Sequence, residues 1–364
     1  MSALSASAGM SMKVSRPMSG GASIVQLDRA VTLDEARAVA ARLAQDPAVE
    51  YAVPDVMLRK AAVPNEPRYV QWQWNLFDPS AQYTGAVGAV TKSAAAVGGS
   101  NLPGAWDLTT GSNAVIVAVV DSGIANHPDL NGLTGTPYAP SGRFLPGYDF
   151  ISDNVGAPEL PTNFVANDGN GRDSDPSDPG DWVTANEKAM YDSCDDGRAG
   201  QTDSSWHGTH MAGIVGATAN NGAGIAGIGW NVRVLPVRAL GKCGGTTSDI
   251  ADAIRWSAGL AVMGVPNNPN PANVISLSLG GPGACSAPLQ AAVTAAVNAG
   301  AVIVAATGND GDNQIGAPGN CNGVIAVTAH TINGESADYA NVGSGTAISA
   351  PGGGKPAVLG TGGA

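Results

Sequence analysis

The strongest constraint on the fold is a series of nearly continuous apolar runs that alternate with helical patterns from about residue 113 onward. The runs are rich in Val, Ile, Leu and Ala, and they cover residues 114–120, 232–240, 273–280, 301–308 and 323–330. Strands this apolar are typical of a parallel sheet that helices cover on both faces. Between the runs, helical spacing of apolar residues predicts helices over 209–219, 248–259 and 287–300. The sequence therefore predicts an α/β fold with an open, mostly parallel sheet and right-handed crossovers.

Composition narrows the classes of partner. The 364 residues carry a formal net charge of −12 and are 43% hydrophobic, which excludes bulk disorder. The excess of acidic residues argues against a nucleic-acid or anionic-membrane partner. The sequence contains no apolar run of ~18 residues, the length that a membrane-spanning helix needs. The opening MSALSASAGMSMKVSRPM lacks the basic start and apolar stretch of a signal peptide. The protein is therefore either cytoplasmic or a chain whose natural start lies upstream.

Four cysteines, Cys194, Cys243, Cys285 and Cys321, stand at long spacings without a C-x-x-C pair. This spacing disfavours a zinc site and is compatible with two disulfides in any of three connectivities. Four reduced, buried thiols in a cytosolic protein are the alternative.

The chain divides into two predicted regions, 1–63 and 64–364. In the first, residues 21–30 alternate like a strand, 33–45 have helical spacing, and 49–58 return to a strand pattern, so a small α+β unit is expected. Turn chemistry over 61–76 predicts a linker. In the second region, a polar insertion over 150–205 and a Pro/Asn-rich loop over 262–272 interrupt the strand–helix alternation.

Two polar residues stand where an α/β sheet collects its working residues, at the carboxyl ends of strands. Asp121 ends the first apolar run and Asn309 follows the fourth, while His207 begins a predicted helix. Together they suggest a general base oriented by a carboxylate, with an amide to stabilise an oxyanion. Taken singly, Asp121 and Asn309 also suit turns, and His207 also suits a structural role. A metal pair of His207 with His210 lacks the Glu of H-E-x-x-H.

These residues stand in motifs that resemble those of the subtilisin-like serine proteases. The motifs, in chain order, are VVDSGI, HPDL, HGTHMAG, SLSLGG and AATGND. Residues 20–60, which include PAVEYAVPD, resemble the second half of that family's inhibitory propeptide. The resemblance implies a secreted endopeptidase zymogen with a subtilisin-like fold. It also implies that Asp121 and His207 are the acid and base of the catalytic triad, and that Asn309 is the oxyanion-hole amide.

The same resemblance implies a binding site for a polypeptide substrate. The residues that would line the pocket for the P1 side chain are Ser278, Leu279, Gly280, Ala305, Ala306 and Thr307. Gly241, Gly244 and Gly245 would form the edge that pairs with an extended substrate. The partners implied are the substrate and the chain's own propeptide as an intramolecular inhibitor, in a monomeric protein.

The family's nucleophile lies in a G-T-S-M-A-x-P motif, which the sequence does not contain. Residues 345–351, GTAISAP, resemble it with Ala at the serine position. The longer stretch 339–353 resembles instead the family's Y-S-N-x-G…A-P-G-G segment, so Ser349 is expected to be a strand or loop serine. We expect the nucleophile beyond Ala364, and we expect the propeptide's first strand and helix to be missing, as in an internal piece of a longer precursor.

Secretion implies oxidised cysteines. The expected bridges are Cys285–Cys321, which flanks the segment that carries Asn309, and Cys194–Cys243, which ties the polar insertion to the substrate edge. The rival interpretation is a catalytically inactive pseudoprotease or a calcium-dependent binding module, although a binding module has no need of Asp121, His207 and Asn309 together.

Two places could hold a calcium ion, which prefers oxygen ligands. The loop 167–182 clusters such groups at short spacing: Asp168, Asn170, Asp173, Asp175 and Asp178. A solvated acidic loop is the alternative for this segment. The resemblance adds Asp129 and Asn221, which match ligand positions of a calcium site common in the family, where sodium or an empty site is the alternative.

Overall fold

The computed structural model describes residues 2–18, 21–55, 63–87, 90–152, 160–191, 194 and 200–354. It divides into two compact units, residues 1–60 and 61–364, which are described separately. No helix within the described ranges is long and apolar enough to cross a membrane.

The first unit is a small α+β structure. Its elements are α1 (Ser2–Ala8), β1 (Met12–Pro17), β2 (Ser23–Leu27) and α2 (Leu33–Leu43). β1 and β2 pair antiparallel, and Ala8, Met12 and Val39 form the core. The helix predicted over 33–45 is confirmed as α2, and a capping box between Thr32 and Glu35 starts it.

Before β2, the first unit has a helix and a strand, α1 and β1, that the sequence pattern did not predict. The small residues of α1 have no helical apolar pattern, and this helix is held by tertiary contacts, among them hydrogen bonds from the Arg42 guanidinium to the Ala8 carbonyl. The strand predicted over 49–58 is not formed in its described part, residues 49–55, and the remainder lies outside the described residues.

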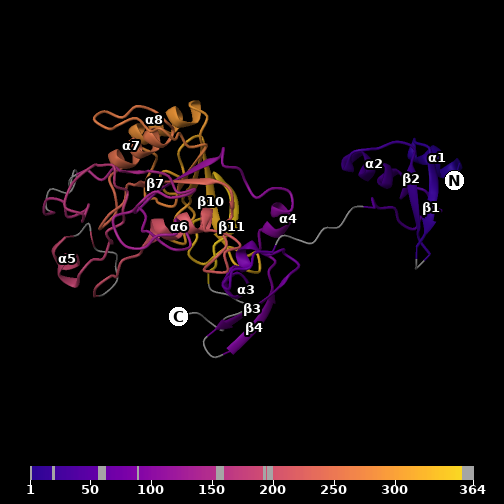
Figure 1. The fold of residues 1–364 in the computed structure, drawn as a ribbon, viewed down its shortest axis with the longest axis horizontal. Coiled ribbons are helices and arrows are strands. Elements are labelled where there is room, and N and C mark those ends of the chain that lie inside the picture. Colours follow the sequence, from indigo (N-terminus) through magenta and orange to yellow (C-terminus); the bar gives the residue numbers. More distant parts are fainter. Residues whose placement is uncertain are drawn as a thin grey trace. The chain divides into compact units, whose positions relative to one another are not determined.

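The second unit is built on a seven-stranded parallel sheet (Figure 1). The strand order is β11-β10-β9-β8-β5-β7-β6. The strands are β5 (Ile116–Asp121), β6 (Tyr148–Asp149), β7 (Arg233–Arg238), β8 (Val274–Leu277), β9 (Val302–Ala306), β10 (Val324–His330) and β11 (Thr346–Pro351). All five predicted strands are confirmed; β6, which has two residues, and β11 complete the sheet.

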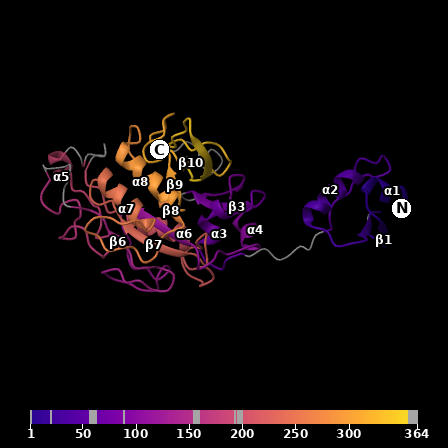
Figure 2. The ribbon, with the colours of Figure 1, turned by 90° about the horizontal axis from the view of Figure 1, so that it is seen from above.

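Helices cover both faces of this sheet, as the apolar strand pattern predicts. Ile116, Ala118 and Val120 of β5 belong to the same core as α7 (Thr247–Ser257) and α8 (Ala287–Asn298), which pack side by side (Figure 2). Val119 instead contacts the core of α6 (His207–Gly216). Because successive side chains of a strand point to opposite faces, α6 lies on the face opposite α7 and α8.

The segment predicted as a linker is part of the second unit. It contains α3 (Tyr69–Trp72) and a 3₁₀ helix η1 (Trp74–Leu76), followed by an antiparallel hairpin of β3 (Gln82–Val87) and β4 (Val90–Ala95) and by α4 (Leu102–Trp106). Tyr69 and Leu76 are buried in one aromatic cluster with Trp106. The linker prediction is therefore wrong, because tertiary contacts bury Tyr69 and Leu76 although the segment has no periodic apolar face.

Both expected disulfides are present. Cys194 is bonded to Cys243, and Cys285 to Cys321, so none of the four cysteines is free. The first bridge joins the polar insertion, which also contains α5 (Ala185–Met190), to the loop after β7.

Candidate active site

The site begins with a buried carboxylate at the carboxyl end of the sheet. Asp121 is the last residue of β5 and is fully buried. Its Oδ1 lies 2.7 Å from Nδ1 of His207 and also accepts a hydrogen bond from the Ser122 amide at 2.7 Å. A buried carboxylate is costly unless it is paired, so this contact accounts for a polar residue after an apolar strand.

His207 is the first residue of α6, and its neighbour brings that helix close to β5. The Gly208 amide donates to Ser122 Oγ at 2.9 Å, and Ser122 Oγ donates to the buried Asp178 at 2.8 Å. A Cβ at position 208 would overlap the Gly123 carbonyl oxygen. Glycine at this position therefore allows the approach that brings His207 to Asp121.

The surroundings of the His207 imidazole raise its pKa. The hydrogen bond to Asp121 raises the pKa of His207, partial burial opposes the rise, and the charges of Asp181 and Asp178 add to it. The His207 side chain is 41% exposed, whereas that of Asp121 is 1% exposed. With Nδ1 held by Asp121, Nε2 is the ring nitrogen available to another reactant, which is the arrangement of a general base with an orienting carboxylate.

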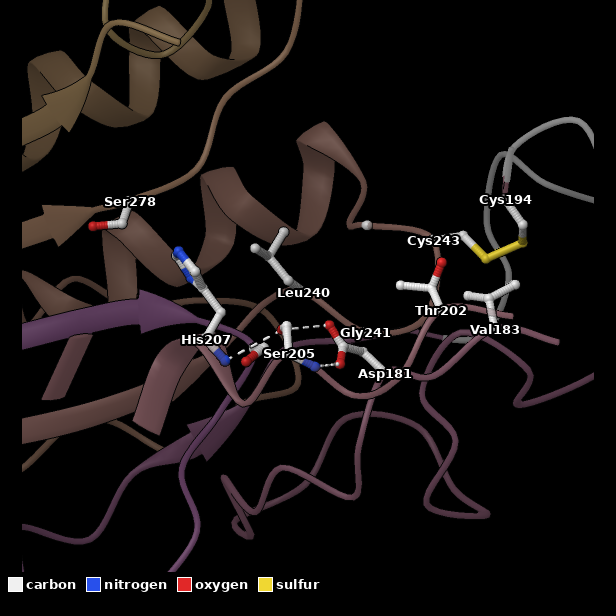
Figure 3. Close-up of a pocket in the computed structure, with 12 residues that line it drawn as sticks. Asp181, Val183, Cys194, Thr202, Ser205, His207, Leu240, Gly241, Cys243 and Ser278 are labelled. Atoms are coloured by element: carbon white, nitrogen blue, oxygen red, sulfur yellow. Dashed lines mark hydrogen bonds between the residues drawn. A yellow bond between two sulfur atoms is a disulfide. The ribbon is translucent and has the colours of Figure 1, made fainter. Parts of the chain in front are cut away.

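His207 opens into a cavity of about 420 Å³ (Figure 3). The expected site residues among its lining are His207, Ser278, Gly241 and Gly244. Ser278 follows β8, the two glycines follow β7, and Ser122, which also lines the cavity, follows β5, so three strand ends converge here. In Figure 3, His207 and Ser278 lie at one end of the cavity and the Cys194–Cys243 disulfide at the other.

The remaining expected substrate residues lie on the same edge of the sheet. Ala305 and Ala306 end β9, Thr307 follows them, and Leu279 and Gly280 follow β8. Leu279, Ala305 and Thr307 are buried. These five residues do not line the cavity beside His207.

Asn309 follows β9 and is exposed. Its side-chain amide forms no hydrogen bond with any residue that the structure describes. The donor is therefore available to a ligand at this edge of the sheet.

Sequence reasoning missed the residues by which the insertion supports His207. Ser205 Oγ accepts a hydrogen bond from the His207 amide at 3.2 Å and donates to Asp181 at 2.7 Å, and the Ser205 amide donates to the same carboxylate at 2.6 Å. Both residues line the cavity. Asp181 lies in the loop 167–182, but only its acidic character was visible in the sequence, because the partner is 24 residues away.

Ser349 lies in a strand, as the resemblance of residues 339–353 to the family's Y-S-N-x-G…A-P-G-G segment implies. It belongs to β11, and its hydroxyl hydrogen-bonds Nδ1 of His330 at 3.0 Å. Nε2 of His330 in turn contacts the Gly98 carbonyl oxygen at 2.8 Å. Ser349 is thus engaged with a different histidine from the one that Asp121 orients.

The acidic loop 167–182 is held by protein contacts. Asp168 forms an ion pair with the buried Arg238 at 2.6 Å, and Asn170 donates to Asp173. Asp173 also accepts from the Asp175 amide at 2.6 Å. Within the described ranges, no three Asp, Glu, His or Cys side chains converge as a metal site.

The second candidate metal site has a different character. Asp129 is buried, its Oδ1 accepts from the Asn221 side chain at 2.8 Å, and its Oδ2 accepts from the Ile225 amide at 2.9 Å. The backbone amide of Asn221 donates a hydrogen bond at 3.0 Å to Oε1 of Glu66, a residue that is 2% exposed. Oε2 of Glu66 is buried with no hydrogen-bond partner among the described residues. Sequence reasoning missed Glu66 because it treated 61–76 as a linker.

Comparison with known proteins defines the family. Residues 112–362 match the profile of the Subtilase family. The chain is 44% identical over 338 residues to an extracellular protease of Xanthomonas campestris pv. campestris, covering 93% of this chain and 50% of that protein. It is 38% identical over 346 residues to an extracellular basic protease of Dichelobacter nodosus, covering 95% of this chain and 51% of that protein.

A solved structure described as proteases from Pseudoalteromonas arctica is 47% identical, with a TM-score of 0.66, and the match covers 80% of this chain and 73% of that one. The chain belongs to the subtilase family of serine proteases. It spans about half the length of the two curated relatives described here.

Proposed function

We propose that this protein is a secreted subtilisin-like serine endopeptidase in which His207 is the general base and Asp121 orients it. The observation that carries the proposal is the 2.7 Å contact between the buried Asp121 and a half-exposed His207 at the end of a cavity. The extracellular relatives and the two disulfides support secretion.

The mechanism follows from the orientation of the ring. Nδ1–H of His207 donates to Asp121, which fixes the tautomer and leaves Nε2 as a base. Nε2 takes the proton of a serine hydroxyl as its oxygen attacks the carbonyl carbon of the scissile peptide bond. Asp121 then stabilises the imidazolium, and the Asn309 amide donates to the oxyanion. The imidazolium gives the proton to the amine nitrogen as the C–N bond of the peptide breaks. Water, deprotonated by Nε2, then attacks the serine ester, and the proton returns to the serine oxygen as the acyl group leaves.

The serine belongs to the G-T-S segment of the longer protein, which the printed sequence does not contain. Two facts support this assignment: the chain spans about half of its two curated relatives, and Ser349 is hydrogen-bonded to His330 instead of His207. A peptide substrate would lie along Gly241 and Gly244, with its reacting carbonyl between His207 and Asn309.

Residues 1–63 are proposed to be an inhibitory propeptide segment, and residues 64–364 the peptidase region. The matches to both curated relatives extend over more than nine-tenths of the chain, including most of the first unit. The proposal predicts that the first unit, added separately, inhibits the mature enzyme.

We propose calcium for the second candidate site. The carboxylates of Asp129 and Glu66 both accept hydrogen bonds from Asn221, and the buried Glu66 Oε2, which has no partner among the described residues, is an oxygen that a cation would bind. A bound ion would neutralise the two carboxylates and stabilise the contact of the 64–69 segment with the 218–225 loop. The calcium proposal does not extend to Asp168, because Arg238 already compensates its charge.

The test is peptide hydrolysis by the full-length gene product, compared with hydrolysis by the 364-residue chain. We expect the full-length protein to hydrolyse peptides and the printed chain to be nearly inert. His207→Ala removes the base and should lower kcat by about 10⁶-fold. Asn309→Ala should lower kcat by about 10²–10³-fold with little change in KM. A folded, processed full-length protein without activity would favour the pseudoprotease alternative.

A further inference from the structure

A buried asparagine outside the catalytic motifs holds the loop that carries Asn309. Asn341 lies between β10 and β11 and is 2% exposed. We infer that Asn341 is a positioning residue for the oxyanion-hole amide of Asn309, an inference that rests on the proposed protease function. No motif of the sequence assigns it this role.

The Asn341 side chain binds the loop on the carboxyl side of Asn309. Its Oδ1 accepts hydrogen bonds from the Asp310 amide at 2.8 Å and the Asp312 amide at 3.3 Å. Its Nδ2 donates to the Asp310 carboxylate at 3.0 Å. One buried side chain therefore fixes the backbone of the turn that follows Asn309.

The Asn341 backbone binds the loop on the amino side of Asn309. Its amide donates to the Gly308 carbonyl at 3.1 Å, and its carbonyl accepts from the Thr307 hydroxyl at 2.7 Å. The same carbonyl accepts from the Thr328 hydroxyl of β10 at 2.8 Å, which anchors Asn341 to the sheet. Asn309 is thus bracketed by contacts to a single residue.

Gly308 makes this close approach possible. Its φ of +116° is a conformation that side chains rarely adopt, and a Cβ there would overlap Asn341 Nδ2 and stand 3.1 Å from its Cγ. Gly308 and Asn341 therefore depend on each other: the glycine leaves the space that the buried amide fills.

Asn341 is fully hydrogen-bonded, whereas the Asn309 side-chain amide that it positions is left without a partner among the described residues. Every polar group of Asn341 bonds the loop or β10. An oxyanion hole requires a donor that is oriented before the reaction, because reorienting it in the transition state would cancel its benefit. Asn341 supplies that orientation without touching the substrate.

The first measurement is amide hydrogen exchange of the printed chain, which requires no activity. Asn341→Ala should speed exchange at Asp310 and Asp312 by at least about 10-fold, since it removes their acceptor. The matched control is Asn268→Ala, another buried asparagine whose side chain bonds backbone groups, at Trp256 in the last turn of α7 and at Asn270 in a loop. This control should leave exchange over 307–312 unchanged. Equal exchange in the wild type and Asn341→Ala would overturn the inference.

The second measurement is a double-mutant cycle in the full-length enzyme. Asn341→Ala should lower kcat by at least about 10-fold and change KM by less than about 2-fold, because the donor acts in the transition state. With Asn309→Ala already present, the added Asn341→Ala should change kcat by less than about 2-fold, since no donor remains to be positioned. Asn268→Ala should leave kcat at the wild-type value.

A swap of the two polar partners separates positioning from loss of folding. Asn341→Asp/Asp310→Asn conserves charge and keeps a hydrogen bond between the two side chains, with donor and acceptor exchanged. It should recover kcat to within about 5-fold of the wild type. Multiplicative effects of Asn341→Ala and Asn309→Ala, or an unchanged kcat in an active enzyme, would overturn only this inference. An inert wild-type enzyme would overturn the proposed function and the inference together.

Discussion

Gly208→Ala is the smallest change that should separate His207 from Asp121. The new methyl group would overlap the Gly123 carbonyl oxygen and stand 3.0 Å from the Gly123 amide nitrogen and 3.2 Å from Asp121 Cβ. Two of these neighbours are backbone atoms next to β5, so they cannot turn aside as a flexible side chain could. The start of α6 must therefore retreat by about 1 Å to restore an ordinary contact.

The expected cost follows from that displacement. A misplacement of about 1 Å of a catalytic group lowers the rate by about 10²-fold, and overpacking of this kind lowers the free energy of unfolding by about 1–3 kcal/mol. The longer Asp121–His207 contact should also lower the pKa of His207, because the hydrogen bond to Asp121 is the main cause of its rise.

The chain offers a matched control in the same helix. At Gly213, an added Cβ would meet Ile225 Cδ1 at 3.7 Å and Leu130 Cδ2 at 3.8 Å, which are ordinary contacts. Gly213→Ala should be neutral or stabilise by up to about 1 kcal/mol through helix propensity. The assays are peptide hydrolysis by the full-length enzyme, thermal unfolding, and titration of His207 by NMR. Wild-type kcat and an unshifted His207 pKa in Gly208→Ala would refute the reasoning.

Three further predictions follow from other contacts. Asp121→Asn removes the group that raises the pKa of His207, and it should lower kcat by about 10⁴-fold. The acid limb of the kcat/KM profile, which rises as the base loses its proton, should move to lower pH. An unmoved acid limb would contradict this prediction. Cys285→Ala/Cys321→Ala opens a loop of 36 residues and should lower the free energy of unfolding by about 4 kcal/mol in denaturant titrations, whereas a loss below about 1 kcal/mol would count against the bridge. EDTA should lower the melting temperature of the wild type more than that of Glu66→Gln, and equal melting temperatures with and without EDTA in the wild type would argue against calcium at Glu66 and Asp129.

The parts of the fold that the sequence predicted are those with local signals. The five apolar runs required buried strands, and the helix over 33–45 carried its apolar spacing. Asp121 was visible because a carboxylate directly after an apolar strand needs a partner, and His207 because it begins a helix within a distinctive motif. The contact between them joins residues 86 positions apart.

The parts that the sequence did not predict depend on contacts that leave no local pattern. Glu66 is buried by a partner 155 residues away, so its segment had only the composition of a linker. Asp181 and Ser205 lie in a polar insertion without periodicity. Their contacts with each other and with His207 form only in the folded chain, so no local pattern indicated them. Asn341 was part of a recognised motif, but its role depends on a loop about 30 residues earlier.

The central claim is that His207, oriented by Asp121, activates a serine outside the printed sequence. The most direct measurement is labelling of the processed full-length protein with a fluorophosphonate, which bonds to an activated serine oxygen with loss of fluoride, followed by mass-spectrometric mapping. We predict one modified serine, within a G-T-S segment absent from the 364 residues, and loss of labelling in His207→Ala. Labelling of Ser349, or labelling that persists in His207→Ala, would contradict the account.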